Sequence, residues 1–241
     1  MTKKIELAGL VIEIHSLYDS LPNTAEYETD ADADFTVEIT EADIEAEYKK
    51  SVAEAEYEGL PYPGFSAESL ENTAIYRKIA MKLPAYDALV FHGSAVAAGD
   101  RAYLFTAKSG TGKTTHTALW LKNIGGSYVV NGDKPIIRMI DGTPYVCGTP
   151  WMGKEGYGCN KTVPLAALCF LNRGEENRIE KTDFGSVFPR LMGQAYRPPD
   201  GMLLARTLKI LEAVGKAVPI YELYCNMEDE AATVSYRGMT E

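Results

Sequence analysis

Two pairs of apolar runs in this chain are joined by connections too short for anything but a hairpin. In ALVFHGSAVAAGDRAYLFTAK (residues 88–108) only residues 98–101 separate the two runs. A parallel crossover needs a dozen residues or more, so the two strands are predicted to pair antiparallel. KPIIRMIDGTPYVCGTP (residues 134–150) repeats the arrangement, with Asp141 and Gly142 as the turn. We therefore expect an α/β fold whose sheet is mixed or largely antiparallel, unlike the doubly wound folds, in which helices link parallel strands.

The second strand of the first hairpin runs into a glycine-rich stretch, FTAKSGTGKTTHTALW (residues 105–120). The stretch fits the pattern Gly, four residues, Gly-Lys, then Ser or Thr, except that the small residue Ala107 replaces the first glycine. In that pattern the backbone amides cradle phosphates, the lysine neutralises their oxygens, and the hydroxyl binds magnesium. A helix that begins at the loop would direct its free amides at the anion. The pattern predicts ATP and Mg²⁺ as ligands, and the alternative is an ordinary glycine turn before a helix. The predicted nucleotide-binding residues are Ala107, Lys108, Ser109, Gly110, Thr111, Gly112, Lys113, Thr114 and Thr115.

Magnesium needs further oxygen ligands besides Thr114. SYVVNGDK (residues 127–134) forms a short apolar strand followed by Asp133, which we expect to be the second metal ligand. The alternative is a plain Asn-Gly-Asp turn. His92 is expected on the first strand of the hairpin, where it either packs, lies near the γ-phosphate or a metal, or relays a proton. His92, Lys113 and Asp133 are thus the candidate catalytic residues.

Charge divides the chain into two regions. Residues 1–75 contain 18 acidic and 4 basic side chains, a net charge of −14, whereas residues 76–241 contain 16 and 20, a net charge of +4. We expect an acidic α+β region at 1–85 and a nucleotide-binding domain at 86–241. The overall charge of −10 argues against nucleic acid as a partner. No apolar run approaches the ~20 residues of a membrane span. The four cysteines form no CxxC pair, which favours reduced thiols in the cytoplasm.

The coarse secondary structure follows from the hydrophobic periodicity. Within the acidic region, Thr40 and Asp43 predict a capping box at the start of a helix. In the second region we expect the internal proline to break the helix in FGSVFPRLMGQAY (residues 184–196). The predicted elements are strands at 4–18 and 35–39, helices at 41–58, 66–83 and 201–217, buried strands near 163–173 and 218–225, and a last helix or tail near 227–239.

HGSAVAAGDRAYLFTAKSGTGKTT followed by VVNGDK resembles the kinase domain of HPr serine kinase/phosphorylase, and it is similar to the nucleotide-binding core of ATP-dependent phosphoenolpyruvate carboxykinase. The resemblance covers residues 86–135 well. It implies that Lys113 binds the phosphates, Thr114 binds magnesium and His92 is the active-site histidine. Asp133 matches the second of two adjacent aspartates. Gly132 replaces the first, which in the kinase looks like the base that acts on the substrate serine.

Substrate contacts are expected from basic and polar residues further along the chain. WMGKEGYGCN (residues 151–160) is a glycine-rich loop that carries Lys154 and Asn160. Arg178, Arg190 and Arg197 are candidates for stabilising charge during transfer. The predicted function is an ATP- and magnesium-dependent phosphotransferase that acts on a hydroxyl of a protein, a peptide or a small metabolite, with homo-oligomers allowed. The alternative is a nucleotide-binding regulatory module without phosphoryl transfer.

Overall fold

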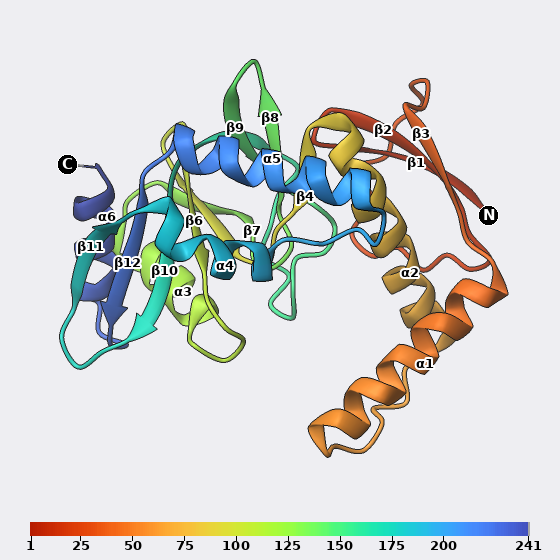
Figure 1. Ribbon diagram of the computed structural model, residues 1–241, viewed down its shortest axis with the longest axis horizontal. Helices are drawn as coiled ribbons and strands as arrows, with labels where there is room; N and C mark the ends of the chain where they lie inside the picture. Colours follow the sequence, from red (N-terminus) through yellow and green to blue (C-terminus); the bar gives the residue numbers. More distant parts are fainter. Residues whose placement is uncertain (241) are drawn as a thin grey trace. The chain divides into compact units, whose positions relative to one another are not determined.

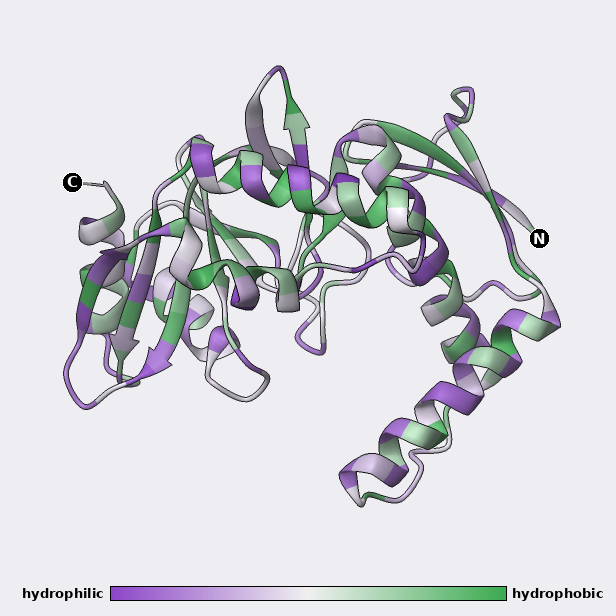
Figure 2. Ribbon diagram, viewed as in Figure 1, coloured by the Kyte–Doolittle hydropathy of each residue, from purple (hydrophilic) through white to green (hydrophobic). Residues whose placement is uncertain are grey.

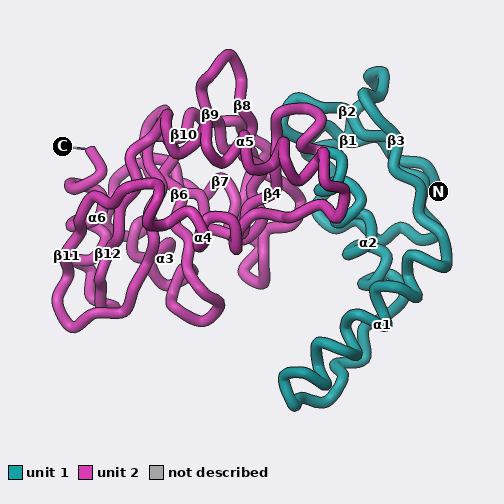
Figure 3. The backbone as a smooth tube through the Cα atoms, in the orientation of Figure 1, with its two compact units in different colours: residues 1–82 teal, residues 83–241 magenta. Residues whose placement is uncertain are grey.

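The computed structural model describes residues 1–240 (Figure 1). The chain divides into two compact units, residues 1–82 and residues 83–241 (Figure 3). No helix formed by residues 1–240 is long and apolar enough to cross a bilayer.

The first unit contains a three-stranded sheet and two helices. Strands β1 (Thr2–Leu7) and β2 (Leu10–His15) form an antiparallel hairpin, and β3 (Phe35–Glu38) pairs parallel to β2. The single strand predicted at residues 4–18 is therefore wrong. The chain reverses at Ala8 and Gly9, whose φ angles are 55° and 72°. Alanine rarely adopts a positive φ, so the sequence carried only a weak turn signal at this point.

The two helices of the first unit are α1 (Glu41–Glu58) and α2 (Ala67–Lys82). The predicted capping box is confirmed, because the backbone N–H of Thr40 donates to Asp43 Oδ2 at 2.8 Å. Gly59 ends α1 in the left-handed conformation. The fully buried Glu71 of α2 accepts hydrogen bonds from the backbone N–H groups of Leu17 and Tyr18. These bonds tie α2 to the segment that follows β2.

The second unit is built on a nine-stranded sheet. The strand order is β4-β8-β9-β10-β6-β5-β7, with β12 pairing to β10 and β11 to β12. β10 runs parallel to β6 and to β12, and the other pairs are antiparallel. The predicted α/β fold with a mixed sheet is confirmed. The strands are β4 (Ala88–Val90), β5 (Ser94–Ala98), β6 (Arg101–Thr106), β7 (Ser127–Asn131), β8 (Ile136–Ile140), β9 (Thr143–Cys147), β10 (Thr162–Arg173), β11 (Arg178–Thr182) and β12 (Ile220–Cys225).

Both predicted hairpins are present, β5–β6 and β8–β9. Asp141 and Gly142 have φ angles of 48° and 79°, as a tight two-residue hairpin turn requires. The prediction that His92 lies on the first hairpin strand is wrong. The apolar run breaks between β4 and β5, where the backbone N–H groups of Phe91, His92 and Gly93 donate to carbonyls of three different residues, Pro135, Gln194 and Asp133. His92 lies in this break.

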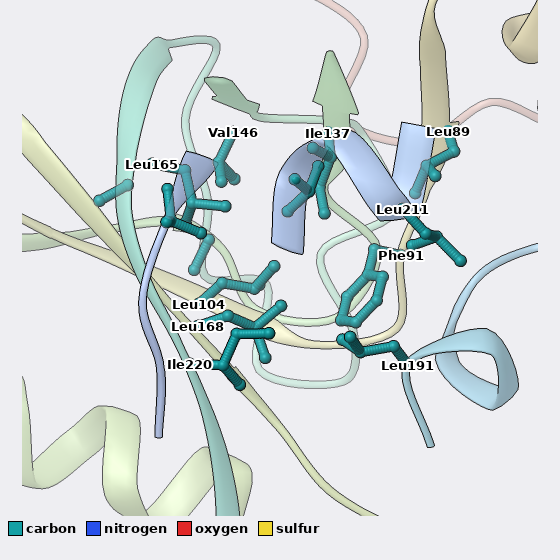
Figure 4. Packing of buried hydrophobic residues seen from close by; sticks show 14 of the residues in the cluster. Leu89, Phe91, Leu104, Ile137, Val146, Leu165, Leu168, Leu191, Leu211 and Ile220 are labelled. Carbon is teal, nitrogen blue, oxygen red and sulfur yellow. The ribbon is translucent and has the colours of Figure 1, made fainter. Parts of the chain in front are cut away.

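Helices cover both faces of the sheet. On one face α4 and α5 bury a cluster that includes Leu104, Leu168 and Leu211 (Figure 4). On the other face Phe105 and Trp120 belong to a second cluster, with α3 and α6. Successive residues of β6 thus point to opposite layers. Hydrophobic and hydrophilic residues are interspersed along α5 (Figure 2), and its buried residues Thr207, Ile210, Leu211 and Val214 recur at the three- to four-residue spacing of an amphipathic helix. The helical segments of this unit are η1 (Leu83–Tyr86), α3 (Lys113–Asn123), α4 (Phe184–Gln194), α5 (Gly201–Ala217) and α6 (Glu230–Thr240).

The expected break in the helix at Pro189 is wrong. α4 continues through Pro189 from Phe184 to Gln194. The proline lies in the second turn, where it removes one backbone hydrogen bond, while Val187 and Leu191 remain buried on the core side. The Asp183 side chain caps the helix by accepting from the backbone N–H of Ser186 at 3.0 Å.

Candidate functional site

The glycine-rich loop lies between the end of β6 and the start of α3. Gly110 and Gly112 have φ angles of 77° and 124°, in the region that only glycine adopts readily. A Cβ at either position would meet no atom within 4 Å, so the backbone conformation and not crowding requires glycine. Gly112 is the N-cap of α3, and the helix begins at Lys113. The loop therefore leads into the free N–H groups of a helix start, an arrangement that suits an anion.

Lys113 lies across this loop. Its Nζ donates to the carbonyl oxygen of Ala107 at 3.1 Å. Burial lowers the pKa of Lys113, the carboxylate of Asp133 opposes that effect, and the nearby Lys134 adds to it. Ala107 is buried in the cluster around Phe105 and Trp120, where its methyl group packs in the core. The methyl group of Ala107 is thus accommodated where the usual pattern has glycine.

A cavity of about 490 Å³ lies beside the loop. It brings together residues from four separate stretches of the chain: the β4–β5 break, the loop with the start of α3, the turn after β7, and the segment 152–157. Lys113, Thr114, His92 and Asp133 all line it. Its lining residues are His92, Ser94, Ser109, Gly110, Gly112, Lys113, Thr114, Thr115, Thr117, Gly132, Asp133, Met152, Gly153, Lys154, Glu155 and Tyr157.

His92 is held at both its backbone and its ring. Its N–H donates to the carbonyl of Gln194 at 2.7 Å, and Thr106 Oγ1 donates to its carbonyl at 2.9 Å. Nδ1 lies 2.7 Å from Lys134 Nζ. A lysine ammonium only donates, so Nδ1 accepts and the ring proton is on Nε2.

Burial and three charged neighbours set the protonation of His92. Burial lowers its pKa to about 4, helped by the charges of Lys134 and Lys113 and opposed by Asp133, whose Oδ1 lies 3.7 Å from Nδ1. The imidazole is therefore neutral at pH 7. In this state it presents an N–H donor and is a poor base.

The turn that follows β7 is organised by the fully buried Asn131. Its Oδ1 accepts from the backbone N–H groups of Asp133 at 2.9 Å and Lys134 at 2.7 Å. Its Nδ2 donates to the carbonyl and the hydroxyl of Thr149 at 3.0 and 2.9 Å. Asp133 Oδ2 lies 3.8 Å from Lys134 Nζ. The amide side chain thus fixes the position from which the Asp133 carboxylate enters the cavity.

Gly132, between Asn131 and Asp133, has no room for a side chain. A Cβ would lie 2.8 Å from the carbonyl oxygen of Met152 and 3.2 Å from that of Tyr157. Its N–H donates to the Tyr157 carbonyl at 2.9 Å. The segment 152–157 therefore occupies the space where a first aspartate of the pair would extend. The same segment brings Lys154 and Glu155 to the cavity.

The residues present fit a magnesium ion that is shared with a phosphate ligand. Mg²⁺ is usually held by one or two carboxylates together with substrate phosphates and water, and the cavity offers the Asp133 carboxylate and the Thr114 hydroxyl. Within residues 1–240, no group of three or more His, Cys, Asp or Glu side chains could hold a metal ion. A metal here would thus depend on oxygens of its ligand.

The other predicted substrate residues lie in different places. Lys154 lines the cavity, whereas the exposed Asn160 lies outside its lining. Arg178 on β11 pairs with Glu180 at 3.1 Å and stacks on Tyr224. The structure does not bring Asn160 or Arg178 into the cavity.

Arg190 and Arg197, the other two arginines predicted to stabilise charge during transfer, lie in α4 and in the segment after it. Arg190 pairs with Glu222 at 2.7 Å, stacks over Phe170, and lines a separate cavity on another side of the loop. Arg197 is exposed in the segment that follows α4. Neither side chain lines the cavity that contains Lys113.

Sequence reasoning passed over three residues at this site. Lys134 contacts His92, Glu155 lines the cavity, and Arg173 donates from Nη2 to the carbonyl of Gly110 at 2.7 Å. Arg173 ends β10, which runs parallel to β6, so both strands deliver their ends to the same edge of the sheet. A polar residue at the end of a buried strand was the available signal for Arg173. Lys134 and Glu155 directly follow Asp133 and Lys154, which the sequence predicts as site residues.

Comparisons with known proteins leave the family open. No protein-family model and no curated protein matches the chain. Among solved structures, the HPr(Ser) kinase/phosphatase from Coxiella burnetii is similar over 62% of this chain and 95% of its own, with 10% identity and a TM-score of 0.34. That TM-score is below the level that establishes a shared fold. The assignment of the site therefore rests on the geometry of this chain.

Proposed function

We propose that residues 83–241 bind a nucleotide with Mg²⁺ and transfer its terminal phosphoryl group to a hydroxyl of a protein, a peptide or a small metabolite. The supporting observation is that one cavity is lined by the glycine-rich loop, Lys113, Thr114, Asp133 and His92. Phosphoryl transfer depends mainly on positioning and charge neutralisation, and these side chains are of the types that supply both.

Each side chain receives a role from its contacts. Thr114 and Asp133 would hold Mg²⁺, which when bound neutralises charge on the phosphate oxygens. Lys113 donates to oxygens of the terminal phosphates. His92, neutral and protonated on Nε2, donates a hydrogen bond to an oxygen of the transferring group. A bond forms between the acceptor oxygen and phosphorus as the bond to the leaving nucleotide breaks, and Asp133 takes the proton of the acceptor hydroxyl.

Nucleotide binding is tested by comparing two lysines on the same helix. Lys113→Ala removes the ammonium at the loop. Lys122, in the last turn of α3, is exposed and pairs with Asp229, and Lys122→Ala removes that pair. Calorimetric titration of the full chain with ATP and Mg²⁺ should show binding that Lys113→Ala weakens at least about tenfold and Lys122→Ala leaves unchanged. Undiminished binding by Lys113→Ala would refute the assignment.

Transfer is tested separately with Asp133→Asn, which preserves shape and removes the charge. Release or transfer of labelled γ-phosphate should occur with the unmodified chain and fall by at least about 100-fold in the variant. Equal turnover by the two proteins would show that Asp133 does not serve the reaction.

A second candidate function is a nucleotide-binding regulatory module without transfer. The observation that favours it is the absence of space at Gly132, which leaves Asp133 as the acid of that turn in the cavity. Tight nucleotide binding with no loss of γ-phosphate, in the presence of serine-bearing peptides or small hydroxylated compounds, would support the module. The domain boundary near residue 85 and a cytoplasmic location stay predictions of the sequence.

A further inference from the structure

Two further cavities adjoin the glycine-rich loop, and the mechanism above uses neither. One, of about 750 Å³, lies between the loop, the end of β10 and α4. The other, of about 520 Å³, lies between the first turns of α3 and the ends of β10 and β12. Both are large enough for the nucleoside part of a nucleotide. The side chain of Arg173, bonded to the carbonyl of Gly110, lines both.

The linings of the two cavities differ in chemistry. Asn172 and Arg173 line both cavities, and the larger adds the cationic and polar side chains of Lys108, Arg190 and Gln194. The smaller has more apolar side chains, and Leu171 is the one that it shares with the larger. These are Leu119 from α3, Leu171 from β10, Cys225 from the end of β12 and Met227 just beyond it. A nucleobase buries two flat faces and is held mainly by apolar walls.

The smaller cavity is also connected to the site of transfer. It shares Gly110, Gly112 and Thr115 with the cavity that contains Lys113, whereas the larger shares only Ser109 and Gly110 with it and none of the residues of α3. A phosphate chain bound along the loop and the first amides of α3 would therefore have one end in each cavity. His116, which is 2% exposed, forms part of its wall on the first turn of α3.

The wall formed by His116 is fixed by hydrogen bonds. His116 Nε2 and Trp120 Nε1 lie 3.1 and 2.8 Å from Ser235 Oγ, which itself donates to the carbonyl of Ala232. The Ser235 hydroxyl gives its one proton to the Ala232 carbonyl. His116 Nε2 and Trp120 Nε1 therefore both donate to Ser235 Oγ. The ring of His116 is thereby held edge-on against Phe105. This part of the lining is rigid, which lowers the entropy lost when a flat ring binds beside it.

We propose that the cavity between α3 and the ends of β10 and β12 binds the nucleobase, with Leu119, Leu171 and Met227 as its apolar walls. This inference rests on the proposed function, because it places the base of the same nucleotide whose phosphates bind the loop. The larger, cationic cavity is left open to solvent or to another ligand when the nucleotide is bound.

The experiment compares ATP with inorganic tripolyphosphate, each titrated with Mg²⁺ into the full chain. Tripolyphosphate reports on the loop alone, and the difference between the two ligands reports on the base. Met227→Asp and Leu119→Gln alter the proposed walls, and Met227 is 79% exposed, so its replacement leaves the core intact. Gln194→Ala is the matched control in the other cavity.

We expect the unmodified chain to bind ATP more tightly than tripolyphosphate. Each wall variant should lose about tenfold in ATP affinity, with tripolyphosphate affinity within about twofold of the original, and the control should change neither. Equal binding of the two ligands by the unmodified chain would refute the base site and leave the proposed function standing. A loss of ATP affinity in Gln194→Ala, with none in the wall variants, would place the base in the other cavity. Failure to bind either ligand would overturn both the function and the inference.

Discussion

Replacing Gly132 with alanine should destabilise residues 83–241, although glycine-to-alanine changes in loops often stabilise proteins. The new Cβ would lie 2.8 Å from the Met152 carbonyl oxygen and 3.2 Å from the Tyr157 carbonyl oxygen. Both obstacles are backbone atoms, so relief requires movement of the segment 152–157. Overpacking of this kind costs about 1–3 kcal/mol. The reduced entropy of the unfolded chain returns about 0.4–1 kcal/mol, which leaves a net loss of about 1–2 kcal/mol.

Gly125 provides the matched control. It lies in the turn after α3, its φ is not in the left-handed region, and a Cβ there would meet nothing within 4 Å. Gly125→Ala should therefore show only the gain from the unfolded state. Gly132→Asp should lose more stability than Gly132→Ala, because its carboxylate would face two carbonyl oxygens that cannot donate to it.

Urea unfolding followed by tryptophan fluorescence measures these changes. Both tryptophans of the chain, Trp120 and Trp151, lie within residues 83–241, so the signal reports on that unit. The unfolded-state gain is common to both variants, so they differ by the overpacking cost of about 1–3 kcal/mol. With a slope of about 2 kcal/mol per molar urea, the midpoint of Gly132→Ala should lie roughly 0.5–1.5 M below that of Gly125→Ala. Identical midpoints for the two variants would show that the segment 152–157 does not pack on Gly132. Faster γ-phosphate transfer by Gly132→Asp would contradict the same packing.

Three further predictions address other parts of the molecule. Ser235→Ala should lower the free energy of unfolding by about 1–3 kcal/mol, because the donors on His116 and Trp120 lose their acceptor. Ser235→Thr keeps the hydroxyl, so an equal urea midpoint for the two variants would argue against that reason. Glu71→Leu in the first unit should melt that unit at a lower temperature by far-ultraviolet circular dichroism, since two backbone N–H groups are left unpaired, and an unchanged melting curve would contradict it. Burial raises the pKa of Cys147 to about 11, so a thiol reagent at pH 8 should modify it only after urea is added, and rapid modification of the folded chain would refute its burial.

Local signals in the sequence predicted local structure well. The capping box at Thr40 and Asp43 and the turn at Asp141 and Gly142 depend on residues within four positions of one another, and both are present. The turn at Ala8 and Gly9 was missed because a lone glycine is a weak turn signal and alanine rarely adopts a positive φ. The break at His92 was missed because the backbone hydrogen bonds there go to Asp133, Pro135 and Gln194, all at least forty residues further along the chain.

The candidate site divides along the same line. The loop and the start of α3 could be located from contiguous residues, and the cavity contains the four side chains proposed for chemistry there, whose roles stay predictions. Arg173 could not be assigned because its contact with Gly110 depends on the parallel pairing of β10 with β6, which spans more than sixty residues of chain. The lack of space at Gly132 likewise depends on a segment that returns from beyond β9.

The last helix of the chain packs on α3, the helix that follows the loop, and one buried hydroxyl links their side chains by hydrogen bonds. Ser235 of α6 pairs with His116 and Trp120 of α3, which lie 119 and 115 positions earlier in the sequence. A protein shortened to end before Glu230 would retain every residue that lines the cavity beside Lys113. It would nevertheless lose the packing of α6 on α3 and the hydrogen bonds through Ser235. Shortened versions of this chain could therefore fail to bind ligand with an intact cavity lining, and that failure would report on support and not on chemistry.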